Sequence, residues 1–254
     1  MEVTVIGTGT SQGIPVIGCG CVVCRSEDPH DNRLRTSLLV ETSAASITID
    51  IGPDFRQQML RFHDGRLDAV LMTHEHNDHM AGLDDIRPYN FLYHKDFPLY
   101  GLPRVLKDIR DRFSYVFAET KYPGSPSVVL KEIAPWDELR IGDMKIRALP
   151  VRHGALDILG YSFEKFAYLT DVKTLDEEVI EYLQGVEVLI LNALHHRVHH
   201  SHLNLTEALQ LVERIGPGRA YLTHISHHMG LHEEVNRQLP PNVKLAFDGL
   251  KLIV

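Results

Sequence analysis

Four side chains of types that bind divalent metals lie within six residues of one another. Residues 73–79 read Thr-His-Glu-His-Asn-Asp-His. Imidazole and carboxylate are donors that zinc and manganese accept, and metal-bound water is a common nucleophile in hydrolysis. A solvated loop rich in histidine is the alternative, but this density of donors favours a metal site. The candidate ligands are His74, His76, Asp78 and His79.

The apolar run at 69–72, Ala-Val-Leu-Met, stands directly before these candidates and predicts a buried strand. A strand end is a rigid place from which to present side chains. His74 and His76 lie two residues apart, so in extended backbone they project to the same side. Asp78 and His79 fall in the turn or the first helical residues that follow. The two pairs can therefore serve two neighbouring metals.

Three later segments also end in a metal-ligand side chain after an apolar run. They read Val-Arg-His at 151–153, Tyr-Leu-Thr-Asp at 168–171 and Arg-Ala-Tyr-Leu-Thr-His at 219–224. Each residue alone would be an ordinary strand-end residue, but their shared position favours one site. Seven donors exceed what one open metal can use, whereas two metals about 3.5–4 Å apart can share a carboxylate and a bridging water or hydroxide. The added candidates are His153, Asp171 and His224.

Three cysteines, Cys19, Cys21 and Cys24, lie within six residues of one another. This spacing suits thiolate ligation better than disulfides. A closed tetrahedral zinc site needs a fourth ligand, which either His30 or a histidine brought near by the fold, such as His227, could supply. Buried or redox-active thiols are the alternative.

Length and charge limit the class of protein. The chain has 254 residues, of which 44% are hydrophobic, and predicts one domain over 1–254 with a Cys-rich insert at about 18–35. No signal peptide and no apolar run of about 18 residues is found, so a membrane partner is not expected. The net charge of -8 disfavours a large nucleic-acid partner and favours a small substrate. Free thiols predict a cytoplasmic location. The sequence leaves open whether the protein forms a homodimer.

Strands and helices alternate through the chain and predict an α/β fold with a two-layered sheet core and outer helices. The opening strand runs into a Gly-rich turn at 7–13 that lacks the P-loop and Gly-x-Gly-x-x-Gly patterns, so nucleotide binding is disfavoured. A hairpin spans 37–50 and has an acid, Asp50, at its exit. The irregular stretch 114–128 is either a cover for the site or a plain surface loop. Predicted helices include 55–62, 105–113, 175–183 and 205–215, and predicted strands of the second half include 128–133, 138–141, 144–151, 158–163 and 166–170.

These motifs resemble those of metallo-β-lactamase-fold hydrolases over essentially the whole chain. Residues 73–79 match the His-x-His-x-Asp-His motif of that superfamily. The resemblance implies an αββα arrangement, a two-sheet β-sandwich flanked by helices. It also implies two divalent catalytic metals, zinc or manganese, and makes Asp78 a catalytic candidate as well as a ligand. The implied sets are His74, His76 and His153 for one metal, Asp78, His79 and His224 for the other, and Asp171 as the bridge.

Within the superfamily the chain is most similar to PhnP-type phosphodiesterases, which open cyclic phosphates such as phosphoribosyl 1,2-cyclic phosphate. The matching features are Gly-Thr-Gly-Thr-Ser-Gln-Gly-Ile-Pro at 7–15, the triple-cysteine insert and Leu-Thr-His-Ile-Ser-His at 222–227. The resemblance implies one structural zinc held by the insert and a late histidine. That ligand set corresponds to Cys19, Cys21, Cys24 and His227, in preference to His30.

The resemblance also supplies a histidine that is not a ligand, just before a helix. His202, ahead of Leu-Asn-Leu-Thr-Glu-Ala-Leu at 203–209, keeps this spacing, and His200 is the alternative. A histidine so placed can hydrogen-bond a phosphate oxygen or protonate a leaving alkoxide. The other histidines of the segment, His195, His196 and His199, are interpreted as solvated or supporting residues.

The combined prediction is a metal-dependent phosphoric diester hydrolase. Its substrate would be a small cyclic phosphate ester, phosphoribosyl 1,2-cyclic phosphate or a similar cyclic nucleotide, with a metal-bridging hydroxide as nucleophile and His202 as acid. One rival is a tRNA 3′-processing endonuclease of the same superfamily, but the chain has no long basic Gly- and Pro-rich arm to grip tRNA. A second rival, a non-catalytic metal-binding protein on this scaffold, is disfavoured because all seven ligands and His202 are present.

Overall fold

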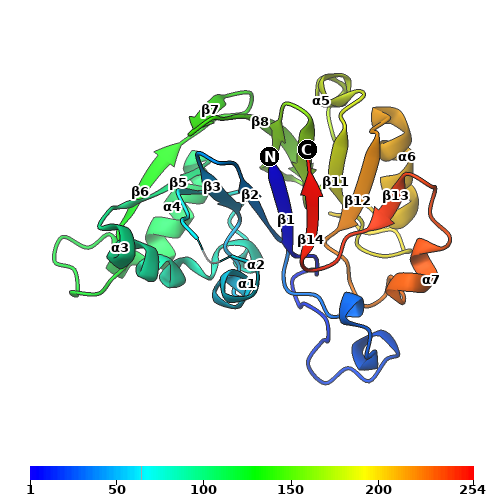
Figure 1. Cartoon of the computed structure of the whole chain (residues 1–254), viewed down its shortest axis with the longest axis horizontal. Helices are drawn as coiled ribbons and strands as arrows, with labels where there is room; N and C mark the ends of the chain where they lie inside the picture. The colour runs from blue at the N-terminus through cyan, green and yellow to red at the C-terminus, as the bar shows by residue number, and fades with distance from the viewer. Residues whose placement is uncertain (64) are drawn as a thin grey trace.

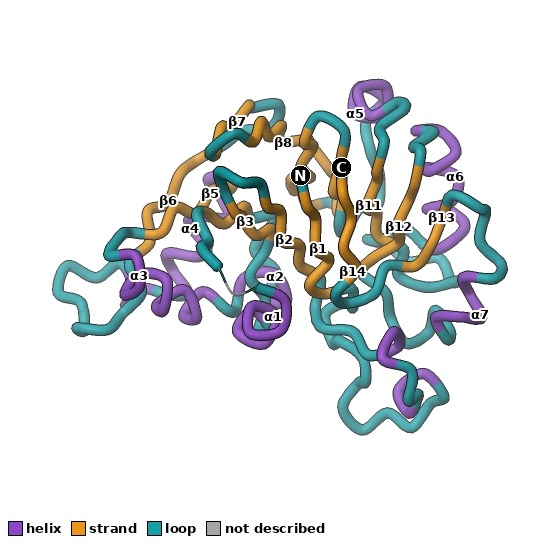
Figure 2. Tube along the Cα trace, in the orientation of Figure 1, coloured by secondary structure: helices purple, strands orange, loops and turns teal. Residues whose placement is uncertain are grey.

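The computed structural model describes residues 1–63 and 65–254. In this part of the chain, two seven-stranded sheets pack face to face and helices cover their outer faces (Figure 1). Figure 2 shows the same division, with the strands in the middle and the helices outside. The predicted two-sheet αββα core is therefore confirmed. No helix among the described residues is long and apolar enough to cross a membrane.

The first sheet has the strand order β14-β1-β2-β3-β4-β5-β6. Its β3, β4, β5 and β6 pair in parallel, so their carboxyl ends lie at one edge. The loop after β4 therefore opens at that edge, and it carries the 73–79 motif. The strands are β1 (Glu2–Gly7), β2 (Ser37–Glu41), β3 (Ser46–Ile49), β4 (Ala69–Leu71), β5 (Phe97–Gly101), β6 (Val128–Glu132) and β14 (Leu250–Ile253). The helices of this half are α1 (Phe55–Phe62), α2 (Asn77–Met80), α3 (Arg87–Tyr93) and α4 (Pro103–Arg112).

The second sheet has the order β13-β12-β11-β10-β9-β8-β7. Its β10, β11, β12 and β13 are parallel, whereas β7 to β10 form an antiparallel meander. The strands are β7 (Glu138–Ile141), β8 (Met144–His153), β9 (Leu156–Phe163), β10 (Phe166–Leu169), β11 (Val188–Asn192), β12 (Arg219–Thr223) and β13 (Val243–Leu245). The helices are α5 (Glu177–Leu183), α6 (Leu205–Ile215) and α7 (His232–Asn236).

Apolar side chains fill three layers: one between the sheets and one under the helices of each half. Helix α6 shows how capping residues determine where a helix begins and ends. The Asn204 side chain accepts the Glu207 N–H at 2.8 Å, and Glu207 accepts the Asn204 N–H at 2.9 Å, which completes a capping box. Gly216, at φ 63°, ends the helix in the left-handed region. The segment before α6 is thus held at a fixed point.

The observed elements differ from the predicted ones in several places. Asp78 and His79, predicted in a turn or in the first helical residues, lie on α2, which begins at Asn77, and a 3-10 turn follows at Leu83–Ile86. Strand β11 was not predicted: its apolar run is buried on both sides between β10 and β12, and so it shows no alternation. The stretch 114–128 starts with a 3-10 turn at Ser114–Val116, and its later part runs beside α3 at the outer edge, where Asn90 bonds the Ser127 backbone (Figure 1). That position favours a plain surface loop.

Candidate metal centre

The seven predicted catalytic ligands converge where four strands end. Within each of three groups drawn from these seven donors the ligand atoms lie within 4.8 Å of one another, and a fourth such group joins His153 and Asp171 to His202. The first group is the implied triad of His74, His76 and His153, and the second is the implied triad of Asp78, His79 and His224. The third group joins Asp171 to one ring of each triad, His74 and His79. The donors are His74 and His76 after β4, Asp78 and His79 on α2, His153 at the end of β8, Asp171 after β10 and His224 after β12.

The arrangement of the ring nitrogens fits bound cations. His74 Nε2 lies 2.9 Å from His76 Nδ1. The Nε2 atoms of His79 and His224 are buried and have no hydrogen-bond partner among the described residues. His79 Nε2 is 3.3 Å from Asp171 Oδ2 and 3.4 Å from Asp78 Oδ2. Buried polar atoms without partners are costly, and divalent ions between these donors would satisfy them.

Asp50 is a buried carboxylate that orients the 73–79 motif. Its Oδ1 accepts the Thr73 N–H at 2.8 Å, and its Oδ2 accepts the Thr73 hydroxyl at 2.8 Å. His79 Nδ1 donates to Asp50 Oδ2 at 2.7 Å, so the lone pair of Nε2 is left for the centre. The sequence analysis noted this acid only as the exit of a hairpin. Its place at the end of β3 becomes informative only when the pairing of β3 with β4 is known.

A backbone carbonyl orients a second ligand. His153 Nδ1 donates to the Ser201 carbonyl at 2.8 Å, which leaves its Nε2 for a metal. Ser201 stands directly before His202, so the histidine-rich segment also supports the ligand set. Nothing in the local sequence around His153 indicated this partner, because 48 residues separate the two.

Three residues of the site have left-handed backbone, namely Asp50 at φ 64°, Asp171 at φ 56° and His224 at φ 55°. This region costs a non-glycine residue of order 1–3 kcal/mol and is held only where the surroundings determine it. Each of the three follows the end of a strand, where the turn redirects the side chain. Three other non-glycine residues with such backbone, His94, Trp136 and Glu164, lie outside this site, so half of those in the described part of the chain belong to it.

Burial and mutual charge shift the pKa values of the donors in different directions. Burial, aided by the charge of His79, holds the pKa of His74 well below its usual range. Burial alone would raise the pKa of Asp171, but the neighbouring His224 and His79 lower it overall. For His79, burial acts downward, yet Asp171 and Asp50 raise its pKa well above the usual value. The cluster thus attracts positive charge, which a divalent ion can supply in place of a proton.

His202 lies against the ligands without being one of the seven. Its ring stacks on His224 at 4.8 Å between centroids, and its Nδ1 is 3.6 Å from Asp171 Oδ1. Burial, with the nearby His224, lowers the pKa of His202 to about 3, so the free ring is neutral. His200, the alternative, is exposed. Position favours His202, and the catalytic role of either stays a prediction.

The three cysteines surround one imidazole nitrogen. The Sγ atoms of Cys19, Cys21 and Cys24 lie 3.3, 3.4 and 3.5 Å from His227 Nδ1. A backbone hydrogen bond from Cys24 is the largest influence on Cys21 and helps to lower its pKa to about 6, which favours a thiolate. His30 points elsewhere, with its Nδ1 3.1 Å from Asp28 Oδ1. The structure therefore places His227, and not His30, beside the thiols, in a set that suits structural zinc.

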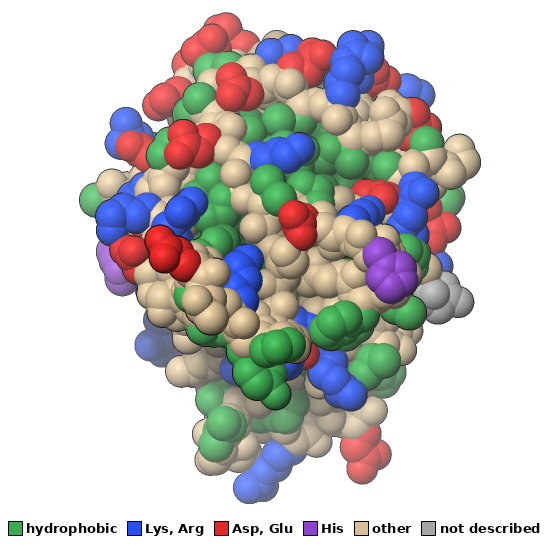
Figure 3. Space-filling view, turned by 90° about the vertical axis from the view of Figure 1, so that its left-hand side faces the viewer, with side chains coloured by type: hydrophobic (Ala, Val, Ile, Leu, Met, Phe, Trp, Pro, Cys, Tyr) green, Lys and Arg blue, Asp and Glu red, His purple; other side chains and the backbone are tan. Residues whose placement is uncertain are grey.

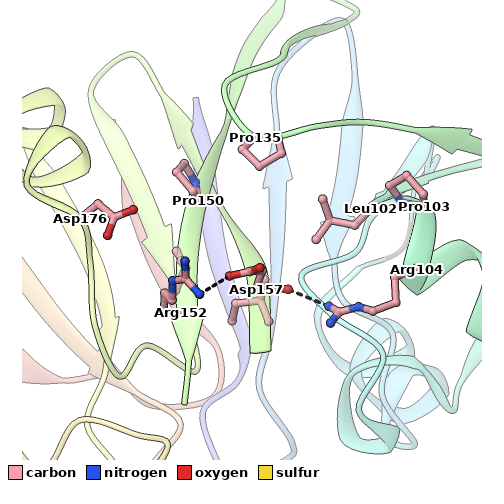
Figure 4. A pocket seen from close by; sticks show the side chains of 10 residues that line it. Leu102, Pro103, Arg104, Pro135, Pro150, Arg152, Asp157 and Asp176 are labelled. Atoms are coloured by element: carbon pink, nitrogen blue, oxygen red, sulfur yellow. Dashed lines mark hydrogen bonds and ion pairs between the residues drawn. The ribbon is translucent and has the colours of Figure 1, made fainter. Parts of the chain in front are cut away.

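A cleft of about 570 Å³ lies between the start of α4 and the β8–β9 hairpin (Figure 4). Arg152 reaches Asp157 with Nη1 at 2.9 Å from Oδ1, and Arg104 donates to the Asp157 carbonyl at 2.7 Å. Arg104 also lies 3.2 Å from Glu75, which stands between two ligands of the motif. The cleft thus adjoins the 73–79 motif, and both of its arginines are paired.

Comparison with known proteins adds sequence relatives. A family model described as "Beta-lactamase superfamily domain" matches residues 46–225. The chain is 40% identical to a solved diphosphatase from the PhnP family, with a TM-score of 0.92 over 99% of this chain and 96% of that one. It is 44% identical to an octanoyltransferase of Porphyromonas gingivalis over all of this chain but 52% of the relative. A ribonuclease Z of Methanopyrus kandleri is 30% identical over 50% of this chain and 43% of the relative. The chain spans about half the length of these curated relatives.

Proposed function

The chain belongs to the β-lactamase superfamily and, within it, to the PhnP family, and from that premise we propose that it is a binuclear metal-dependent phosphodiesterase. The observation that carries the proposal is the convergence of seven imidazole and carboxylate donors, among which the buried Nε2 atoms of His79 and His224 have no hydrogen-bond partner among the described residues. The proposed substrate is a small cyclic phosphate ester, phosphoribosyl 1,2-cyclic phosphate or a similar cyclic nucleotide.

We propose two divalent ions, zinc or manganese, with Asp171 shared between the two triads. When bound, such a pair supplies an activated water at neutral pH and offsets the charge of the phosphate. Asp50 and the Ser201 carbonyl hold the rings of His79 and His153 in one orientation. The ligands are therefore preorganised, which lowers the cost of ordering them around substrate.

His202 is proposed as the proton donor. Hydrolysis breaks the bond between phosphorus and the sugar oxygen, and the departing alkoxide must gain a proton. His202 lies beside Asp171 and His224, at the edge of the cluster, where a leaving oxygen can reach it. A bound anionic phosphate would raise the pKa of His202 back toward its usual value. If the leaving group needs no proton, the same ring can instead hydrogen-bond a phosphate oxygen.

The Cys19, Cys21, Cys24 and His227 set is proposed to hold a structural zinc. Four protein donors close a tetrahedral site, so this ion would contribute to folding and not to turnover. Free thiols also support the proposal of a cytoplasmic location. A monomer and a homodimer are both compatible with this function.

Other activities are weaker candidates. Ribonuclease Z relatives match only about half of this chain, and its net charge of -8 opposes a tRNA substrate. Acidic and basic side chains are interspersed on the face shown in Figure 3, which offers no broad basic surface. The name octanoyltransferase belongs to a relative of which this chain covers 52%. Hydrolysis of a diphosphate linkage is a second candidate, favoured by the name of the 40% identical relative.

A substrate screen with manganese- or zinc-loaded protein tests the proposal. Bis(p-nitrophenyl) phosphate, cyclic ribose phosphates, cyclic nucleotides, a diphosphate ester and a precursor tRNA form the panel. We expect diester hydrolysis that a chelator abolishes and added metal restores. Precursor tRNA as the best substrate would favour the ribonuclease alternative. No turnover of any diester at full metal occupancy would favour a non-catalytic metal-binding protein.

A further inference from the structure

Strand β9 has a strand partner along almost all of one side but along only part of the other. On the first side, β8 pairs with it from Leu156 to Ser162. On the second side, β10 pairs with Tyr161, Ser162 and Phe163 and with no other described residue of β9. The backbone of β9 at 156–160 therefore has no strand partner on that side, and its polar groups need partners from elsewhere.

The 73–79 motif and Arg104 supply those partners. The Thr73 carbonyl accepts the Leu159 N–H at 3.1 Å. The Asp157 carbonyl accepts a hydrogen bond from Arg104 Nη2 at 2.7 Å, and the same nitrogen lies 3.2 Å from Glu75 Oε2. Hydrogen-bonding positions on one side of an antiparallel strand recur at every second residue, which is the spacing of Leu159 and Asp157. Arg104 thus extends the link between the motif and β9 toward the start of that strand.

The two partners of Arg104 lie beside the ligands of one metal. Glu75 stands between His74 and His76 in the motif. Asp157 belongs to the β8–β9 hairpin, whose first strand ends at His153. These three histidines form the first implied triad. Neither partner of Arg104 lies on α2 or after β12, the elements that carry the ligands of the second triad.

Burial explains why Glu75 needs Arg104. The Glu75 side chain is 16% exposed, and its Oε2 atom is buried with no hydrogen-bond partner among the described residues. Such a carboxylate oxygen is costly unless an opposite charge lies beside it, and Arg104 supplies that charge. Helix α4 is itself fixed, because its apolar face is buried under the first sheet. Figure 4 shows the Arg104 side chain reaching from α4 to the Asp157 carbonyl.

Resting on the two-metal assignment of the proposed function, we propose that Arg104 is a positioning residue for the first metal triad. It acts through Glu75 and the Asp157 carbonyl and is not itself a ligand. By holding both, it sets the separation between the motif, which carries two rings of the triad, and the hairpin that carries His153. Without it, the metal itself would have to order the three rings, so its affinity would fall.

Cobalt binding to variants with one complete triad tests this role, because its readout is affinity and not turnover. His224→Ala leaves the first triad complete, and His153→Ala leaves the second. A chelator first empties the His/Asp cluster, and thiolate charge-transfer absorption identifies any cobalt that enters the Cys cluster. Arg104→Met should weaken cobalt binding about 10- to 100-fold in His224→Ala, the usual worth of a residue that orients ligands. In His153→Ala it should change the affinity by less than about twofold.

Two further substitutions separate this contact from general charge. Arg110→Met is the matched control, because Arg110 lies on the same helix with its guanidinium over the Phe117 ring, 5.4 Å from the centroid. It should leave cobalt affinity unchanged in both backgrounds. Glu75→Gln removes the charge that Arg104 balances but keeps the Asp157 contact, so in His224→Ala it should reproduce part of the loss.

The split between the two backgrounds decides the proposal. No loss from Arg104→Met in His224→Ala, or an equal loss in His153→Ala, would overturn it, because a general weakening of the fold would not select one triad. Asp78→Asn removes a ligand of the same triad as His224 and takes the place of His224→Ala if that variant does not fold. Hydrolysis of bis(p-nitrophenyl) phosphate by wild type tests the proposed function separately, since the cobalt affinities do not depend on turnover.

Discussion

The part of the chain that the structure describes holds two clusters of metal-ligand side chains, and they differ in the type of donor and in the elements that carry the donors. The His/Asp cluster is made of nitrogen and oxygen donors at strand ends, in more than one converging group. The Cys cluster has four donors around one point. Its three thiols lie on a surface insert whose regular structure is limited to 3-10 turns such as Val23–Arg25, and His227 comes from the loop after β12. A site on rigid strands whose metals keep an open coordination position can exchange water and substrate. Four protein donors that close around one ion leave no open position and instead stabilise the fold.

Different parts of the fold hold the two clusters in place. Buried side chains hold the His/Asp cluster, with Asp50 bonded to His79. The insert is tied down further along the chain by the buried Arg33, which donates to the Thr8 hydroxyl at 2.9 Å and lies 3.0 Å from His232 Nδ1. Changes at the first cluster should therefore alter chemistry, and changes at the second should alter folding. The predictions below follow that contrast, from the largest effect on turnover to the smallest.

Asp171→Ala should have the largest effect. The substitution removes the carboxylate that groups with His74 of one triad and His79 of the other within 4.8 Å, so metal content should fall and diesterase turnover should be abolished. The fold should persist, because the two sheets do not depend on this side chain. Asp111→Ala, at an exposed residue paired with Lys107, is the matched control. Full activity in Asp171→Ala would refute a two-metal mechanism.

His202→Ala should leave metal content unchanged and lower kcat by about 100- to 10,000-fold, the usual worth of one proton donor. The loss should shrink for a nitrophenolate leaving group, which departs without a proton, and should be full for a sugar alkoxide. Equal losses with both substrates would mean that His202 orients phosphate. No loss with either would move the assignment to His200.

Asp50→Asn tests the orienting carboxylate. The amide cannot accept equally from His79 Nδ1 and Thr73, so the ring loses its fixed orientation. We expect metal affinity to fall by about 10- to 100-fold, with turnover recovered at high metal concentration. Affinity equal to that of wild type in a metal competition assay would show that Asp50 has no such role.

Cys21→Ser should have the smallest effect on turnover. It should remove one zinc per chain and lower Tm, by roughly 10 °C if the closed site contributes about 3 kcal/mol. The remaining folded protein should keep its catalytic metals and its diesterase rate. Zinc stoichiometry equal to wild type would remove the structural-zinc assignment, and a lost rate at unchanged stability would place this cluster in the chemistry.

The contrast also explains what the sequence could and could not predict. The 73–79 motif is local, and both its strand and the direction of its side chains follow from spacing. Helix α6 was predicted at Leu205–Ile215, its observed bounds, because Asn204 is a cap and Gly216 is a stop. The Cys spacing is equally local, but it does not by itself choose between His30 and His227, since more than 200 residues separate the thiols from His227. The family resemblance implied His227, and the structure places that residue beside the thiols.

The supporting contacts were beyond sequence reasoning for a physical reason. The Ser201 carbonyl that orients His153 is backbone and has no residue signature. Asp50 acts through pairing of β3 with β4, which a linear reading does not supply. Left-handed backbone at Asp171 and His224 is also invisible in residue type, because neither is a glycine. The sequence thus identifies donors, whereas the orientation of those donors depends on tertiary contacts.

The central claim is that turnover belongs to the His/Asp cluster and not to the Cys cluster. Stepwise loading of metal-free protein with cobalt tests it directly, because thiolate-to-cobalt charge-transfer absorption reports filling of the Cys cluster alone. The account predicts that hydrolysis of bis(p-nitrophenyl) phosphate rises with cobalt bound beyond that absorbing site, and that Cys21→Ser loses the absorption but keeps the rate. Turnover that rises and saturates with the thiolate absorption, and disappears with it in Cys21→Ser that stays folded, would contradict the account.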